Sequence, residues 1–184
     1  MKRNLLLLLL LFTLILPTFA FSEDSTNVPI DIPIYKDADV NLEVNLDNEN
    51  ILPAIKAAIA FMKDGEKVSE KIDFVTLESV IKDLKRIQLL ELSIPVEKAK
   101  TDEIIVFYNE EVAKEKWTPV MKQTLPKGTF ALFTKDGGES IFAYRVWEDK
   151  YESGNLSKAM VLKTEGKIDI PKLIQMAYQY FFVK

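Results

Sequence analysis

The chain of 184 residues contains no cysteine and no histidine. The absence of cysteine excludes disulfides, a thiolate nucleophile, cysteine-ligated zinc or haem, and a cysteine near residue 20 that could carry a lipid. The absence of histidine excludes the Ser-His-Asp and Cys-His arrangements and the usual histidine-bearing metal sites. The sequence therefore predicts no cofactor and no metal, and it leaves packing alone to hold the fold together.

Basic charge and glycine are also scarce. Lysine and arginine number 24 against 28 aspartate and glutamate residues, which gives a net charge of −4. Because no basic stripe runs along the chain, the phosphate backbone of a nucleic acid would be repelled, and we expect no nucleic-acid partner. Of the six glycines, only Gly137 and Gly138 are adjacent. A Walker loop and a dinucleotide-binding fingerprint are therefore both absent.

The clearest pattern that is present lies at the start of the chain. Two basic residues precede an apolar run from Leu5 to Leu16, and small residues follow at Thr18 and Ala20. The run is shorter than the roughly 20 residues of a membrane span, and this order is typical of a secretory signal. We expect residues 1–20 to be a signal peptide, and the mature protein to be soluble in the periplasm or outside the cell. An uncleaved leader, the less favoured alternative, is the one expected route to a membrane.

The rest of the chain divides into a tether and one domain. Residues 21–36 are predicted to be an extended N-terminal tether, because Pro29 and Pro33 interrupt an alternation of apolar side chains. Residues 37–184 are expected to form a single α+β domain. Hydrophobic periodicity predicts five strands, at residues 40–46, 87–94, 129–134, 140–147 and 159–162.

Helix start signals complete this prediction. Asn50, Asp73, Thr101 or Asp102, and Asp169 each precede residues with helical spacing. Residues 117–121 are expected to form another helical turn, and residues 148–155 a polar loop. The predicted order is βααβαβββα. We expect a two-layer sandwich of about five mostly antiparallel strands, with helices chiefly on one face.

Two short motifs resemble reactive sites but lack their companions. Asp37-x-Asp39-x-Asn41 imitates the start of a calcium loop, yet Leu42 stands where that loop needs glycine. Ser79-x-x-Lys82 matches the serine and lysine of penicillin-recognising enzymes, but the other motifs of those enzymes are missing. Both matches are better explained as the solvent-facing side of a strand and of a helix.

The predicted strand 140–147 is the region with most potential for binding. Phe142, Tyr144 and Val146 share one face by alternation, and Trp147 lies on the other face with Arg145. One face should meet the helices. The other needs a cover, which could be the tether, the aromatic residues near the end of the chain, a partner or a ligand. Packing in the core is the simpler interpretation. The candidate interaction surface is Phe142, Tyr144, Val146 and Trp147.

Three segments carry a family resemblance: Trp117-Thr118-Pro119-Val120, the apolar strand 159–162, and Gly166-Lys167-Ile168-Asp169-Ile170. In their order and spacing, residues 38 to 182 resemble a family of small exported bacterial proteins described only as a domain of unknown function, many of them lipoproteins. The resemblance implies a cell-envelope setting and supplies no catalytic residues. This chain departs from the lipoprotein members because it lacks the cysteine that would carry the lipid.

These observations favour an exported, non-enzymatic bacterial envelope protein that binds an envelope protein or an apolar ligand through its sheet or a sheet edge. Two alternatives stay open. The first is a carboxylate-dependent hydrolase acting on cell-wall sugars, which needs two acids that converge on one bond. The second is a structural or regulatory component of the envelope.

Overall fold

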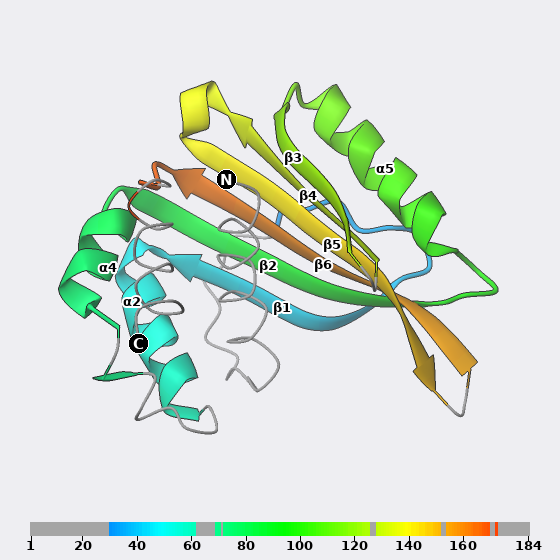
Figure 1. The fold of residues 1–184 in the computed structure, drawn as a ribbon, viewed down its shortest axis with the longest axis horizontal. Helices are drawn as coiled ribbons and strands as arrows, with labels where there is room; N and C mark the ends of the chain where they lie inside the picture. Colours follow the sequence, from blue (N-terminus) through cyan, green and yellow to red (C-terminus); the bar gives the residue numbers. More distant parts are fainter. Residues whose placement is uncertain are drawn as a thin grey trace.

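The protein is built around one antiparallel sheet of six strands in the order β1-β2-β6-β5-β4-β3 (Figure 1). This computed structural model describes residues 30–61, 69–70, 72–125, 128–151, 154–169 and 172. The strands are β1 (Asp39–Asp47), β2 (Leu84–Pro95), β3 (Thr118–Leu125), β4 (Gly128–Lys135), β5 (Ser140–Tyr151) and β6 (Gly154–Gly166). The predicted leader, residues 21–29 of the tether and most of the helix predicted after Asp169 lie outside the described residues.

Helices cover both faces of this sheet. Helix α5 (Thr101–Lys114) packs its buried Tyr108 against Phe142 and Tyr144 of β5. Helices α2 (Asn48–Phe61) and α4 (Phe74–Ile81) pack against the opposite face, where β5 contributes Ile141 and Ala143. Because neighbouring residues of a strand point to opposite faces, β5 supplies both cores. Below, the two faces are named the α5 face and the α2/α4 face.

A side-chain cap explains where α4 begins, and a contact between distant segments holds the start of α2. The carboxylate of Asp73 accepts hydrogen bonds from the backbone N–H groups of Val75 and Thr76 at 3.1 Å, as a helix N-cap does. The pKa of the Asp73 carboxyl group is lowered, chiefly by a hydrogen bond from the Thr76 side chain and then by the one from the Thr76 backbone. At the start of α2, the Asn48 amide donates to the carbonyl oxygen of Lys82 at 3.2 Å and to that of Leu84. These bonds tie the start of α2 to the start of β2.

The core of the α5 face is a cluster of aromatic rings with satisfied polar atoms. The rings of Tyr108 and Tyr144 are stacked with centroids 5.5 Å apart, and Trp117 lies 5.8 Å from Phe142. The Tyr108 hydroxyl donates to the carbonyl oxygen of Pro33 at 3.2 Å. Burial raises the pKa of Tyr144 to about 12, although its hydrogen bond with an asparagine side chain acts in the opposite direction.

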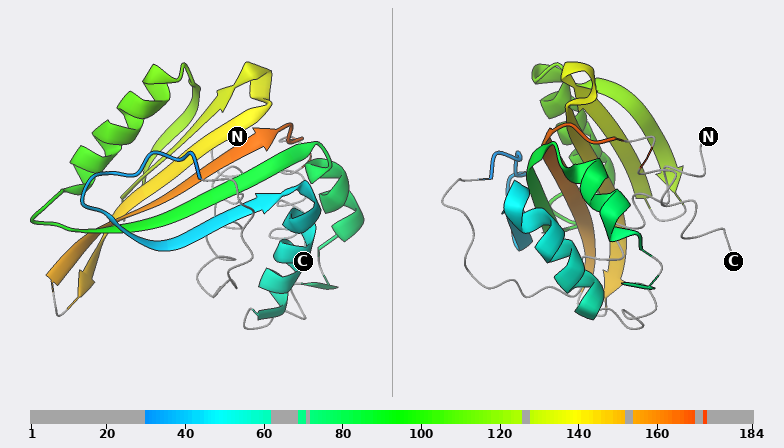
Figure 2. Two further views of the ribbon diagram at one scale, coloured as in Figure 1. Left: turned by 180° about the vertical axis from the view of Figure 1, so that it is seen from behind. Right: turned by 90° about the vertical axis from the view of Figure 1, so that its left-hand side faces the viewer.

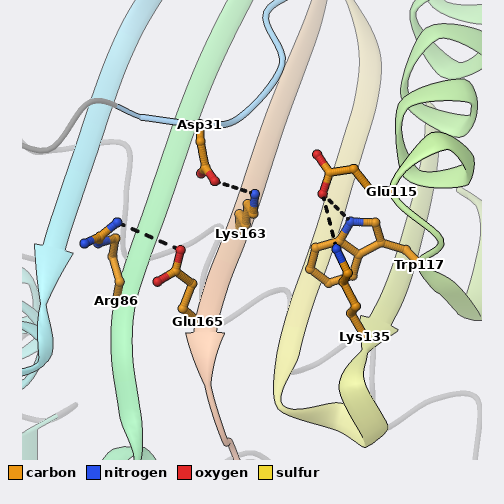
Figure 3. A network of polar contacts seen from close by, with 7 residues as sticks. All are labelled: Asp31, Arg86, Glu115, Trp117, Lys135, Lys163 and Glu165. Atoms are coloured by element: carbon orange, nitrogen blue, oxygen red, sulfur yellow. Dashed lines mark hydrogen bonds and ion pairs between the residues drawn. The ribbon is translucent and has the colours of Figure 1, made fainter.

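The described part of the tether, residues 30–36, crosses the α5 face, and we name it the strap (Figure 2, left). Ile32 is buried in the core of this face. The Tyr35 ring meets Phe107 of α5 edge to face, with centroids 5.3 Å apart. The Lys163 ammonium group donates to the Asp31 carboxylate at 2.7 Å (Figure 3). The strap is therefore a docked part of the fold.

The α+β class and the antiparallel sheet confirm the sequence prediction, but four details differ. The sheet has six strands where about five were expected, and helices lie on both of its faces, so the two-layer arrangement is wrong. Residues 118–121 belong to β3 and not to a helical turn, because Met121 pairs with Leu132 of β4. The expected loop 148–155 is largely strand, because β5 continues to Tyr151 and β6 begins at Gly154.

Candidate functional site

Strands β5 and β6 extend beyond their neighbours as a two-stranded arm (Figure 1). The pairing of β4 with β5 ends at Val146, and that of β2 with β6 ends at Leu156. A ribbon with solvent on both faces needs no apolar alternation, which is why its polar residues were expected to be a loop. On the α2/α4 face, the arm and its base carry a set of side chains that we name the β5–β6 strip: Arg145, Trp147, Tyr151, Leu156, Lys158 and Met160.

The structure separates the four residues predicted as an interaction surface. Phe142, Tyr144 and Val146 are buried under α5, with exposed fractions of 3%, 1% and 0%. Trp147 lies on the opposite face and is half-buried. The first three residues therefore stabilise the core, and only Trp147 is placed to meet another molecule.

Gly128 of β4 lies close against the backbone of Val146 and Trp147. A Cβ atom on Gly128 would lie 2.0 Å from the carbonyl oxygen of Val146 and 2.8 Å from the Cα atom of Trp147. Gly128 also has a φ of +115°, which side-chain-bearing residues rarely adopt. Glycine at this position therefore lets β4 approach the backbone at the base of the strip.

Arg145 supplies a cation that has no counterion among the described residues. Its guanidinium carbon lies 5.0 Å from the centroid of the Trp147 ring, within the range of a cation–π interaction. Within the described ranges, Arg145 forms no ion pair, and its Nε atom is buried without a hydrogen-bond partner. A half-buried guanidinium on an aromatic ring is suited to bind a carboxylate, with which it can form two parallel hydrogen bonds.

Lys158, the cross-strand partner of Trp147, is paired with acids. Its ammonium group lies 3.5 Å from a carboxylate oxygen of Glu91 and 3.6 Å from one of Asp149. Burial lowers the pKa of Lys158, but the hydrogen bond to Tyr151 and the charges of both acids outweigh it, so that the pKa is raised. Lys158 is therefore neutralised within the strip, whereas Arg145 is not.

A second polar contact involves Ser79, which sequence analysis had paired with Lys82. The structure instead brings Lys172 to it, with Nζ donating to the Ser79 hydroxyl oxygen at 2.6 Å. The Ser79 hydroxyl itself donates to the Thr76 carbonyl oxygen at 2.8 Å. A general base would have to accept the serine proton. In this geometry the lysine is the donor, so the contact joins two segments and does not activate a nucleophile.

The described ranges lack two further features, a metal-binding cluster and a membrane-spanning helix. No group of three or more aspartate and glutamate residues is arranged there to hold a metal ion. None of the helices in that part of the chain has the length and apolar character needed to span a bilayer.

Sequence reasoning placed Arg145 beside Trp147 but did not identify Tyr151, Lys158 or Met160 as part of a surface. A signal was present, because residues 145, 147, 149 and 151 alternate with their neighbours beyond the apolar part of the strand. Strand pairing across the turn then places Lys158 opposite Trp147. That pairing depends on the register of β6, which the sequence left open.

Searches of protein-family models, curated proteins and solved structures found no match to this chain. The resemblance to an exported bacterial family therefore stays a prediction. The fold and the β5–β6 strip are what the structure contributes to the question of function.

Proposed function

We propose that the chain is an exported, non-enzymatic module of the bacterial envelope that binds an acidic segment of a partner protein on the β5–β6 strip. The observation that carries this proposal is Arg145. Its guanidinium group stacks on Trp147 at 5.0 Å and has no carboxylate partner among the residues that the structure describes. A carboxylate from another molecule would supply the missing counterion.

The composition of the strip supports a protein as the partner. Tryptophan, tyrosine and arginine are the residues that contribute most often to binding energy at protein interfaces, and methionine is also enriched there. The strip contains all four types, as Trp147, Tyr151, Arg145 and Met160. Tyr151 is 45% exposed in the free chain, so an anchor is accessible at the tip of the arm. Lys158 is already paired with Glu91 and Asp149, so Arg145 is the cation of the strip that would orient a carboxylate of the partner.

The sheet edges are less suited to binding. The edge strands are β1 and β3, and each has an irregular register, between Val40 and Leu42 and between Pro119 and Met121. Bulges and a proline disturb the row of free backbone groups that an added strand would need. The exposed face of the arm is therefore a better docking surface than either edge.

An apolar ligand is also less favoured than a protein. The space between α5 and the sheet, where such a ligand would be enclosed, is filled by side chains. The Tyr144 ring lies 5.5 Å from Tyr108 and 6.1 Å from Phe133, which are contact distances for aromatic rings. Rings at these distances leave no room between them for a bound lipid.

The alternative of a carboxylate-dependent hydrolase needs two acids that flank a scissile bond. Glu91 and Asp149 are the acids that contact the strip, and both lie within 3.6 Å of the Lys158 ammonium group. Both acids are thus engaged in ion pairs with the lysine. This arrangement supports binding over hydrolysis.

The exported setting rests on the predicted leader. If the leader is removed after Ala20, the protein recovered from the envelope begins at Phe21, and mass spectrometry of the intact protein will show this. A protein of full length in the cytoplasm would contradict the proposed setting while leaving the strip as a binding surface.

The binding proposal is tested by photocrosslinking in cells that produce the protein. Replacing Tyr151 with p-benzoylphenylalanine puts a reactive ring of similar shape on the strip, and Val106, which is 53% exposed on α5, is the control position. We expect a crosslinked partner from position 151 only. Arg145→Glu should reduce its yield at least tenfold, because losing one member of a charge pair at an interface costs about 2–5 kcal/mol.

Lys150→Glu is the matched control for this experiment. It makes the same change of charge on the same strand, but Lys150 is exposed on the face opposite the strip. The crosslink from position 151 should persist in the Lys150→Glu variant. If both charge reversals act equally, or if the same protein is captured from position 106, the strip is not the binding surface.

A further inference from the structure

Among the described residues, the arm has a free edge along β5. The pairing of β5 with β4 ends at Val146, but β5 continues to Tyr151, so residues 147–151 pair with β6 on one side only. Figure 1 shows this end of the arm projecting beyond β3 and β4. Because an extended strand with an open edge is a template for another strand, the arm offers a place for one more.

The direction of the backbone groups shows which residues face this edge. The carbonyl oxygen of Val146 points toward β4, since a Cβ atom on Gly128 would collide with it. Successive residues of an antiparallel strand direct their N–H and C=O groups to opposite sides, so Glu148 and Lys150 face the same side as Val146. Both side chains are exposed. Each residue therefore offers one donor and one acceptor to an added strand.

The five residues of this edge, Trp147-Glu148-Asp149-Lys150-Tyr151, are complementary to their own reversed order. Reading them from the two ends matches an aromatic residue with an aromatic residue and an acid with a base. We propose that two copies of the chain pair through this edge in antiparallel order, about a twofold axis at Asp149. Glu148 then lies opposite Lys150 of the second copy, and Trp147 lies opposite its Tyr151. Symmetry forms each of these pairs twice.

Charge selects this register over its neighbours. Backbone hydrogen bonds form only between residues that both face the edge, so the axis must pass through a residue and not between two. An axis at Glu148 would set two carboxylates opposite each other, and an axis at Lys150 would do the same with two ammonium groups. The axis at Asp149 replaces these repulsions with two pairs of opposite charge.

Asp149 meets its own copy at the axis, and its charge is compensated within each copy. Its carboxylate lies 3.6 Å from the Lys158 ammonium group and accepts a hydrogen bond from the Tyr151 hydroxyl at 3.3 Å. The two acids at the axis therefore approach as parts of ion pairs and not as bare charges. Their backbone groups face β6, so they form the pair without mutual hydrogen bonds.

This pairing joins the β5–β6 strips of two copies. Residues opposite each other in antiparallel strands point to the same face, so both strips lie on one side of the continuous sheet. Arg145 lies outside the five paired residues, and its place for a carboxylate is left open. The inference does not depend on the partner proposed for the strip. In the crosslinking experiment at position 151, the pair would give a product of twice the chain mass, distinct from a product with another protein.

Disulfide trapping in cells that produce the full chain tests the pairing. Because the protein has no cysteine, Asp149→Cys gives each copy one thiol at the axis. Opposite residues without mutual hydrogen bonds have Cα atoms about 4.5 Å apart, which a disulfide can span. After oxidation with diamide, we expect about ten times more linked dimer than from Val106→Cys, the exposed control on α5. Equal yields from the two positions would overturn the proposal.

Charge exchange tests the register. In the Asp149→Cys background, Glu148→Lys or Lys150→Glu alone should lower the yield of linked dimer at least about fivefold, because like charges then lie opposite each other. Both changes together should restore it. Copies with Glu148→Lys, distinguished by a tag, should link to copies with Lys150→Glu more than either links to itself. Single changes without effect, or a double change without recovery, would overturn the proposal.

The two proposals can fail separately. Lys150→Glu should abolish the pair of copies while it leaves the crosslink to a partner protein in place. Arg145→Glu should have the reverse effect, because Arg145 is outside the paired edge. If Arg145→Glu lowers the yield of linked dimer as strongly as Lys150→Glu does, the copies do not pair through this edge.

Discussion

Strand β5 carries Tyr144 and Trp147 on opposite faces of the sheet, and their surroundings differ. Tyr144 lies under α5, stacked on Tyr108, and its hydroxyl donates to Asn109 at 2.8 Å. Trp147 lies at the base of the arm, half-buried, with Arg145 over its ring. Tyr144 has these contacts within the fold, whereas the cation over Trp147 has no counterion among the residues that the structure describes. Aromatic content alone thus says little about function.

The two tryptophans repeat this contrast. Trp117 is buried at the end of α5, its indole N–H donates to Glu115 at 3.0 Å, and Lys135 lies over its ring (Figure 3). Glu115 also pairs with Lys135 at 3.9 Å, so this cation has a counterion. The cation over Trp147 has none among the described residues. The difference separates a structural cation–π contact from one suited to binding.

The largest expected effect comes from truncating the α5 core. Phe142→Ala removes a ring that is 3% exposed and contacts both Tyr108 and Trp117. We expect the free energy of unfolding to fall by about 3–5 kcal/mol, as for other buried aromatic residues. Urea unfolding will measure it, with Val106→Ala on the exposed side of α5 as a control near zero. A loss below about 1 kcal/mol would mean that α5 does not seal this face.

A smaller loss is expected from Gly128→Ala at the base of the strip. The added methyl group would meet the Val146 carbonyl oxygen, and the φ of +115° is unfavourable for alanine. Such strained backbone positions cost about 1–3 kcal/mol, and the close contact adds to this. Gly137→Ala is the matched control, because a Cβ atom there meets nothing within 4 Å. Equal losses in urea unfolding would show that only φ, and not the approach to Trp147, requires glycine.

Alkaline pH should weaken the α5 face selectively. Burial raises the pKa of Tyr144 to about 12 and also raises that of Tyr108, whereas unfolded tyrosine has a pKa of about 10. Below pH 10 the phenols are protonated in both the folded and the unfolded chain, and the stability that depends on their burial is fully present. Between pH 10 and 12 the unfolded chain releases protons that the folded chain keeps, so each phenol lowers stability by up to about 1.4 kcal/mol per pH unit.

Urea unfolding between pH 8 and 11 measures this slope. Tyr144→Phe removes one of the two phenols and should make the slope shallower. Tyr151→Phe removes a phenol that is 45% exposed and should leave it unchanged. If the slope is the same in all three proteins, ionisation of the buried tyrosines is not its cause.

Much of the fold followed from local patterns. The alternation at residues 40–46, the apolar run at 87–94 and the cap at Asp73 each produced the predicted element. Strand β3 was missed because its exposed positions are polar and Pro119 interrupts it, so its strand character comes from pairing with β4. The site was predicted only in part, since alternation separates Tyr144 from Trp147 but cannot say which face α5 covers.

The smallest expected effect on stability is that of Trp147→Ala. The ring is half-buried, and its partner Arg145 can turn to solvent when the ring is lost, so we expect a loss of about 1 kcal/mol or less. Trp117→Ala should cost several times more, because that indole is buried and hydrogen-bonded. The order should be reversed in the crosslinking experiment at position 151. Among molecules that remain folded, Trp147→Ala should reduce the yield of the crosslink more than Trp117→Ala does. If Trp147→Ala and Trp117→Ala lose equal stability, Trp147 is a core residue as Tyr144 is, although on the other face. The contrast between the two faces of β5 would then carry no information about binding.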